Sequence, residues 1–186
     1  MVKIEVPLDD ALKRIDFIFK NKTLSTECIN DHKGFSLLGD SFGPFEKGKK
    51  YRMNHFSAIP FIESGVLVVS QNEKYDNVDI QRFAIRERDS QKLIQQDKDN
   101  FLIKSKEFRT LMEKSVEDKK KPKIDLDRYN SYTTNIIDSR LLKLLKLAKT
   151  ELSLDDEKRL TKSEQLLFNK IYNIIRKWRT FFLTFE

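Results

Sequence analysis

The hydrophobic residues in the last third of the chain recur every three to four positions, and this spacing predicts two long helices, over residues 126–152 and 161–185. A helix that packs against one neighbour needs an apolar arc of about 100° around its axis. Both helices carry apolar side chains over a wider arc. Their apolar surface therefore exceeds what packing against a single neighbour would bury.

Two explanations account for this surplus. Either both helices are enclosed within their own domain, or a partner chain covers the part that the domain leaves open. We favour the partner chain, because the remainder of the helical region is small. The residues expected at this subunit interface are Ile137, Leu141, Leu144, Leu145, Phe168, Ile171, Ile174, Ile175, Trp178 and Phe182.

Local signals mark both ends of the second of these helices. Thr161 and Glu164 match the S/T-x-x-E capping box, in which two side chains satisfy free backbone amides at a helix start. The sequence at residues 181–185 is Phe-Phe-Leu-Thr-Phe, and so large an apolar group promotes aggregation when it faces water. We expect this end to be packed, by this chain or by another.

The first 52 residues have a shorter pattern, which predicts a small β-rich domain. Short strands are expected at residues 2–6, 23–29 and 35–38. Residues 9–19 fit either a short helix or a strand. Four of the five glycines fall between residues 34 and 48, where turns between short strands are expected.

Residues 53–186 predict a helical domain. Its expected helices are a short one over residues 54–64 and longer ones over about 76–92, 97–116, 126–152 and 161–185. Gly65 stands where a C-terminal cap would be, and Asn77 or Asp79 would cap the next helix. The fold class expected is α+β, mostly α, with the small N-terminal β-rich domain followed by an elongated helical bundle domain.

The formal net charge of +7 is unevenly distributed. Residues 1–70 hold 10 basic and 9 acidic residues, against 26 and 20 in the remainder, so the excess lies on the helical part. Such a surplus fits a solvated surface, or an alternative function as a basic module that makes salt-sensitive, non-specific contacts with DNA. The candidate DNA contacts are Lys119, Lys120, Lys121, Arg176 and Lys177. The lysines beside Pro122 are also expected to form a mobile loop.

The strongest catalytic signal is the G-x-x-x-x-G-K frame at residues 43–49, which resembles a phosphate-binding loop. Lys50 stands where a Ser or Thr would hold magnesium, and Pro44 lacks an N–H to donate to phosphate. Cys28 has only two histidines to pair with and is expected to serve packing. We therefore expect no enzyme, no cofactor and no metal site.

Three observations predict a soluble intracellular protein. The single cysteine excludes an internal disulfide, the first residues lack the apolar segment of a signal peptide, and no window approaches the length of a membrane span. No contact with a membrane is expected.

The order of motifs from residue 35 onward resembles the GINS replication complex family, in the subunits that carry the β-domain first. Residues 35–48 are similar to the strand and loop that close that domain, and residues 56–69 resemble the short helix and strand that follow. Residues 79–88 and 138–144 and the terminal helix also fall in the family's order. The residues of the family loop motif are Gly39, Asp40, Gly43, Pro44 and Phe45. The resemblance is weak over the first 30 residues.

This resemblance implies a non-catalytic scaffold of the DNA replication fork. GINS links the MCM helicase to a RecJ- or Cdc-type factor, and its helical domains pair with a sister subunit, typically with two copies of each. The short chain suits the archaeal form, so the implied location is cytoplasmic and nucleoid-associated, or nuclear in a eukaryote. Contact with DNA would then be indirect.

Overall fold

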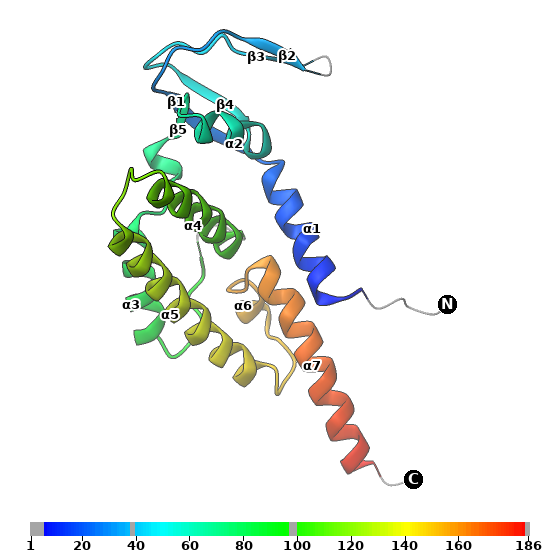
Figure 1. Cartoon of the computed structure of the whole chain (residues 1–186). Helices are drawn as coiled ribbons and strands as arrows, with labels where there is room; N and C mark the ends of the chain where they lie inside the picture. Colours follow the sequence, from blue (N-terminus) through cyan, green and yellow to red (C-terminus); the bar gives the residue numbers. More distant parts are fainter. Residues whose placement is uncertain (1–5, 38–39, 97–99, 185–186) are drawn as a thin grey trace. The chain divides into compact units, whose positions relative to one another are not determined.

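The computed structural model describes residues 6–37, 40–96 and 100–184, and shows a mixed α+β protein that is mostly helical (Figure 1). The chain divides into two compact units, one of Asp16–Lys74 and one that joins Tyr75–Glu186 to Met1–Ile15. The domain boundary expected after residue 52 is therefore corrected, and it lies after residue 74. The reason is that the short helix and strand after residue 52 pack on the sheet: Phe61 and Leu67 share a core with Cys28 and Phe45.

The unit Asp16–Lys74 is built on a three-stranded antiparallel sheet of order β4-β1-β5. Its strands are β1 (Thr23–Cys28), β4 (Lys50–Asn54) and β5 (Leu67–Val69), and a separate hairpin pairs β2 (Phe35–Leu37) with β3 (Asp40–Phe42). The register places Leu24 opposite Met53. Alternate residues of β1 are buried, as period-two patterning requires. The strands expected at residues 23–29 and 35–38 are confirmed.

Helix α2 (His55–Glu63) ends as expected at Gly65, which takes a positive φ of 74°. The N–H of Gly65 donates to the carbonyl of Ile62 at 3.1 Å, and the N–H of Val66 donates to the carbonyl of Phe61 at 2.9 Å. This pair of hydrogen bonds is the Schellman motif, which satisfies the last carbonyls of a helix and favours glycine. The cap turns the chain directly into β5.

Residues 9–19, which fit either a helix or a strand, form most of helix α1 (Leu8–Lys20). Asp9 and Asp10 lie in its first turn and Lys20 in its last, so the charges complement the helix dipole. The strand expected at residues 2–6 lies outside the described residues except for Val6, which belongs to no strand.

The second unit contains the longer helices. They are α3 (Asn77–Asp89), α4 (Phe101–Glu117), α5 (Lys123–Leu147), α6 (Leu154–Glu157) and α7 (Lys162–Leu183), after the 3-10 turn η1 (Gln71–Glu73) of the first unit. The N-cap of α3 is Asp76, not Asn77 or Asp79 as expected, and Asp79 completes its capping box as the N3 residue. Thr161 and Glu164 form the predicted capping box of α7.

The helix expected over residues 126–152 is shorter at its end, because α5 stops at Leu147 and the short helix α6 intervenes before α7. Ser153 caps α6 by accepting the N–H of Asp156. Serine favours such caps over helix interiors, which explains the break.

The core of this unit lies where α3 and α4 pack on α5 (Figure 1). Phe83 and Phe101 meet edge to face at 4.8 Å between ring centroids. The buried hydroxyl of Tyr129 donates to the carbonyl of Ser105 at 3.2 Å. A second cluster joins the end of α5 to the start of α7 through Leu144, Ala148 and Phe168.

Candidate functional site

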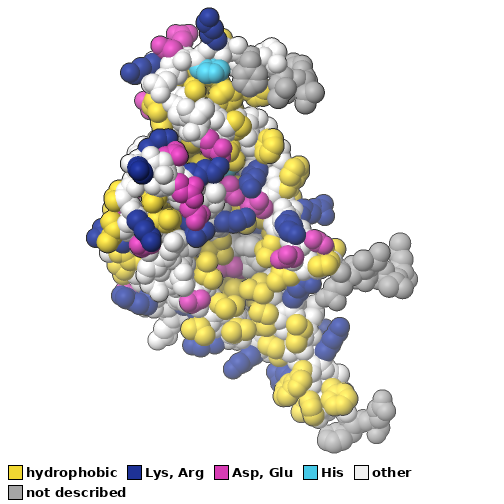
Figure 2. All heavy atoms as spheres, in the orientation of Figure 1, with side chains coloured by type: hydrophobic (Ala, Val, Ile, Leu, Met, Phe, Trp, Pro, Cys, Tyr) yellow, Lys and Arg dark blue, Asp and Glu magenta, His cyan; other side chains and the backbone are white. Residues whose placement is uncertain are grey.

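Most of α7 is not enclosed by the unit to which it belongs. Among its described residues only Glu164 and Phe168, near the start, are buried. The helix then extends away from α5, and apolar side chains follow it to its end (Figures 1 and 2). The exposed apolar residues of this part, which we call the α7 face, are Ile174, Trp178, Phe181, Phe182 and Leu183, each between 59% and 78% exposed.

The aromatic side chains of the α7 face pack against one another. The rings of Trp178 and Phe182 are 5.0 Å apart and tilted, and those of Phe181 and Phe182 are 5.0 Å apart and meet edge to face. Both arrangements are favourable for aromatic pairs. The rings therefore form a continuous apolar surface, unlike the single exposed hydrophobic residues that are common on any protein.

Helix α5 exposes a second apolar row. Ile137, Leu141 and Leu145 recur every four residues and are each at least 36% exposed. This spacing places them on one side of the helix, beside the buried row that includes Ile136 and Leu144. We call these three residues the α5 stripe.

The structure thus sorts the residues expected at a subunit interface into three groups. Ile137, Leu141, Leu145, Ile174, Trp178 and Phe182 are exposed. Ile171 and Ile175 are half-buried and pack against the chain's own core. Leu144 and Phe168 are 2% and 3% exposed, inside that core. For Leu144 and Phe168 the expectation is corrected, because the apolar arc of each helix is shared between the core and the surface.

The start of α7 is held by a buried ionic network centred on Arg140. Its guanidinium donates to Glu164 at 2.6 and 2.8 Å and to Glu87 at 2.7 Å. It also donates to the carbonyls of Ile94 and Arg159, at 2.9 and 3.0 Å. All five N–H groups of Arg140 are therefore used. Lys143 adds a second cation on Glu87, at 2.6 Å.

The network keeps Arg140 charged although it is only 1% exposed. Burial alone would lower the pKa of Arg140, but the hydrogen bonds and negative charges of Glu164 and Glu87 outweigh burial and raise it. Glu164 also accepts the backbone N–H of Thr161 at 2.8 Å, so one carboxylate serves both the network and the helix cap. The first turn of α7 is thereby joined to α3 and α5.

Sequence reasoning did not identify this network as a site. One signal was present: Arg140 lies four residues after Ile136 and four before Leu144, on the buried side of its helix. A charged residue in such a row implies a buried partner. The partners Glu87 and Glu164 lie 53 and 24 positions away in the sequence, and local patterns do not reveal such pairs.

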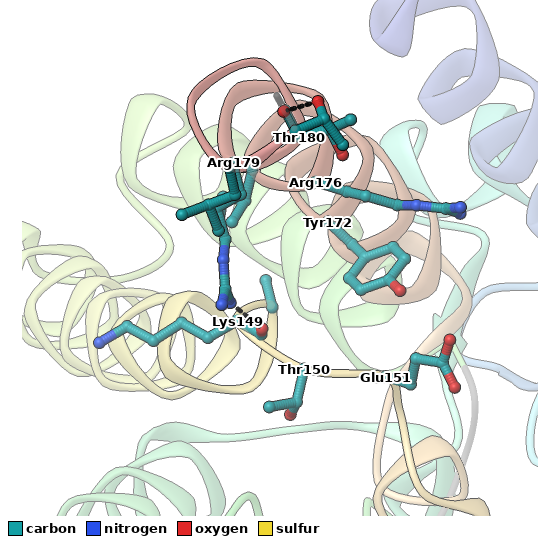
Figure 3. Close-up of a pocket in the computed structure, with 11 residues that line it drawn as sticks. Lys149, Thr150, Glu151, Tyr172, Arg176, Arg179 and Thr180 are labelled. Carbon is teal, nitrogen blue, oxygen red and sulfur yellow. Dashed lines mark hydrogen bonds between the residues drawn. The ribbon is translucent and has the colours of Figure 1, made fainter. Parts of the chain in front are cut away.

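A groove of about 380 Å³ separates the end of α5 from the last turns of α7 (Figure 3). Its apolar lining includes Ala148, Ile175 and Leu183. In Figure 3 the guanidinium groups of Arg176 and Arg179 lie on opposite sides of Tyr172. Among the residues that the structure describes, one hydrogen bond crosses the groove: Arg179 donates to the carbonyl of Lys149 at 3.4 Å.

The candidate DNA contacts occupy separate elements. Lys119, Lys120 and Lys121 lie in the turn between α4 and α5, where Lys120 pairs with Asp118 at 2.8 Å. Arg176 and Lys177 lie on α7 beside the α7 face. The structure therefore does not assemble all five into one cluster on one element.

The family loop motif lies in the first unit. Gly43 takes a φ of 84°, and a Cβ on Gly34 would lie 2.8 Å from the carbonyl oxygen of Phe42, so the hairpin base is closed by two glycines. Phe45 is buried in the sheet core. The side chain of Asp40 and the whole of Gly39 lie outside the described residues.

The phosphate-loop frame does not have the expected surroundings of a nucleotide site. Strand β4 follows it where a phosphate-binding loop opens a helix, and Lys49 pairs with Glu46 at 2.7 Å on the surface. Cys28 is buried and donates to the carbonyl of Asn30. Within the described residues no three His, Cys, Asp or Glu side chains are grouped as metal ligands would be.

In the part of the chain that the structure describes, no helix has the length and apolar character to cross a membrane. No protein-family model and no curated protein matches the chain.

Proposed function

We propose that this chain is a non-catalytic subunit of a GINS-type complex, a scaffold that links the MCM helicase to a RecJ- or Cdc-type factor at the replication fork. The observation that carries the proposal is the α7 face, five large apolar side chains on the last turns of α7 that are exposed in this structure. Burying one such side chain stabilises a protein by roughly 1.5–3 kcal/mol. A partner that covers the α7 face would therefore be held strongly.

The α5 stripe extends the same argument. Obligate subunit interfaces resemble a domain core cut in half and bury more than about 2,000 Å². Aromatic residues are enriched in the centres of such interfaces, as on the α7 face. In the proposed complex the sister subunit covers both surfaces, and two copies of each subunit assemble together.

The order of elements supports the family resemblance. A hairpin and a glycine-closed loop lead into a short capped helix and a short strand, and long helices follow. We propose that these correspond to the family's small N-terminal β-rich domain followed by its elongated helical bundle domain. The proposed location is cytoplasmic and nucleoid-associated, or nuclear in a eukaryote.

The basic surplus supports a second candidate function, a module that contacts DNA without sequence preference. Residues 165–184 contain four basic residues and no acidic residue. DNA affinity that depends on phosphate contacts falls steeply between about 50 and 200 mM salt. Weak affinity without that salt dependence would remove this candidate.

The scaffold proposal is tested by purifying the tagged chain from its native cell and identifying the co-purified proteins by mass spectrometry. The expected result is a second GINS-type subunit together with the MCM helicase. Trp178→Asp should lose both, because it places an unpaired charge in the centre of the interface. Val78→Asp is the matched control, since Val78 is 59% exposed on α3 and lies outside both apolar surfaces. Equal recovery with both variants would contradict the proposal.

A further inference from the structure

The groove between α5 and α7 meets the α7 face at Leu183, and the two surfaces share one electrostatic property. Residues 165–184 and residues 139–150 each contain four basic residues and no acidic one. Arg140 and Lys143 are used in the buried network. Lys170 donates to the carbonyl of Val6 at 3.0 Å. The remaining basic residues of these two segments are Lys146, Lys149, Arg176, Lys177 and Arg179.

The two arginines of the groove make few contacts with the part of the chain that the structure describes. Arg176 forms no ion pair with any residue that the structure describes, and Arg179 makes the one long hydrogen bond to Lys149. Glu151 is the single acidic residue of the lining, and in Figure 3 it lies at the edge, on the side of Arg176. Cations beside an apolar surface favour a partner that brings carboxylates to the same positions.

From these observations we infer that the surface is occupied by an amphipathic helix of a different polypeptide, whose apolar row is bordered by Asp and Glu. An apolar side chain of that helix enters the groove, and its neighbouring carboxylates face Arg176 and Arg179. Guanidinium groups bind carboxylates in a planar, bidentate geometry, which would fix the register of the two helices. This inference rests on the proposed function, because it names the chemistry that the sister subunit presents.

A second copy of this chain fits the surface poorly. Two α7 faces placed together would oppose their own cations, and like charges across an interface are unfavourable. Among the described residues the longest acidic run is in α6, with Asp155, Asp156 and Glu157. At 1.5 Å per residue, its four residues span about 6 Å, whereas the α7 face from Ile174 to Leu183 spans about 15 Å.

Duplex DNA fits less well than protein, because most protein–DNA hydrogen bonds go to phosphate and sugar, and here aromatic rings occupy the centre of the surface. An anionic membrane would also accept a helix of this composition. The α5 stripe favours protein, since it adds a second apolar row on a neighbouring helix of the same unit. The membrane is therefore an alternative that the experiment must separate.

The experiment uses the full chain and its single tryptophan, Trp178, as the reporter. The probes are two designed helical peptides with the same apolar row, bordered by glutamate in one and by lysine in the other. Burial of Trp178 shifts its emission to the blue. We expect the glutamate peptide to bind about tenfold more tightly, as a few exposed ion pairs would provide.

A charge reversal sharpens the test. The double variant Arg176→Glu/Arg179→Glu should reverse the preference, so that the lysine peptide binds more tightly. Lys119→Glu/Lys121→Glu is the matched control, because it changes charge equally in the turn after α4 and should keep the original preference. Circular dichroism of each variant verifies that it is folded. Equal binding of both peptides by the unaltered chain would overturn the inference.

Three further results would overturn it as well. The first is a blue shift of the Trp178 emission when the chain concentration is raised without any peptide. The other two are a blue shift larger than that with the glutamate peptide, produced by phosphatidylcholine–phosphatidylserine vesicles or by duplex DNA. They would assign the surface to a second copy, a membrane or nucleic acid. Failure of the peptide preference, with the sister subunit still recovered from cells, would overturn only this inference. Loss of the sister subunit, with the preference intact, would overturn only the proposed function.

Discussion

The two ends of α7 differ although they belong to one continuous helix. At its start, the buried residues Thr161 and Glu164 form the capping box, and Glu164 accepts hydrogen bonds from Arg140. Phe168 is buried in the hydrophobic core. At its end, from Ile174 to Leu183, large apolar side chains face water. A helix is stabilised mainly by what its apolar face packs against. We infer that the first part of α7 serves the fold of this chain and the second part serves assembly.

The largest effect is expected from Arg140→Met. This change leaves Glu87 and Glu164 buried without their shared cation, and removing one partner of a buried ion pair costs about 3–5 kcal/mol. Urea unfolding followed by circular dichroism measures the loss. Arg176→Met, an exposed change on the same helix as Glu164, should leave the unfolding midpoint unchanged. Equal midpoints for both variants would show that the buried network does not hold α7.

The contrast within α7 is tested by two phenylalanine truncations. Phe168→Ala removes a ring that is 3% exposed and should lower the free energy of unfolding by about 3 kcal/mol. Phe182→Ala removes an exposed ring and should change it by less than about 0.5 kcal/mol in the isolated chain. Comparable losses in the two variants, measured by urea unfolding, would mean that the end of α7 is packed within this chain.

The first unit provides a pH-dependent comparison between its two histidines. His55 is buried, its Nδ1 has no hydrogen-bond partner among the described residues, and its ring packs on Phe19. Burial lowers the pKa of His55, and the charge of Lys20 lowers it further, while Asp16 opposes the change. The neutral form is therefore favoured in the folded state. Its contribution to stability is complete above the unfolded pKa of about 6.5 and is lost as the pH falls from there through the folded pKa.

The measurement is the free energy of unfolding between neutral pH and pH 5. The unaltered chain should lose stability toward pH 5, and His55→Phe should lose less over the same range. His32→Gln removes the exposed histidine and should keep the original slope. A slope that persists in His55→Phe would assign the acid sensitivity to other groups.

The smallest effect is expected for the lysine-rich turn after α4. Lys119→Ala/Lys120→Ala/Lys121→Ala changes exposed side chains outside both apolar surfaces and should alter the free energy of unfolding by less than about 0.5 kcal/mol. Assembly with the sister subunit should also persist in pull-down experiments. Loss of assembly in this variant would place a contact far from the α7 face.

Local parts of the fold could be predicted from the sequence. The strand at residues 23–29, the cap at Gly65 and the capping box of Thr161 depend on residues close in sequence, and the structure confirms all three. Residues 9–19 could not be assigned, because their apolar spacing fits two periods. The domain boundary was wrong because α2 and β5 return to pack on β1, a contact that no local pattern records.

The site could be predicted less completely, because an apolar arc does not show which of its sides meets the core. Leu144 and Leu145 are adjacent in the sequence, yet the first is buried and the second is exposed. Phe168 and Phe182 differ in the same way. Only the packing of α5 and α7 against their neighbours separates the residues that fold the chain from those available to a partner.

The central claim is that the end of α7 is open in the isolated chain and covered in a complex. Acrylamide quenching of Trp178 tests it most directly, because Trp178 is the single tryptophan and lies on the α7 face. We expect acrylamide to quench Trp178 strongly in the purified chain. In the complex with a sister subunit whose own tryptophans have been replaced, Trp178 should be protected. Protection in the isolated monomer, or equal quenching in both states, would contradict it.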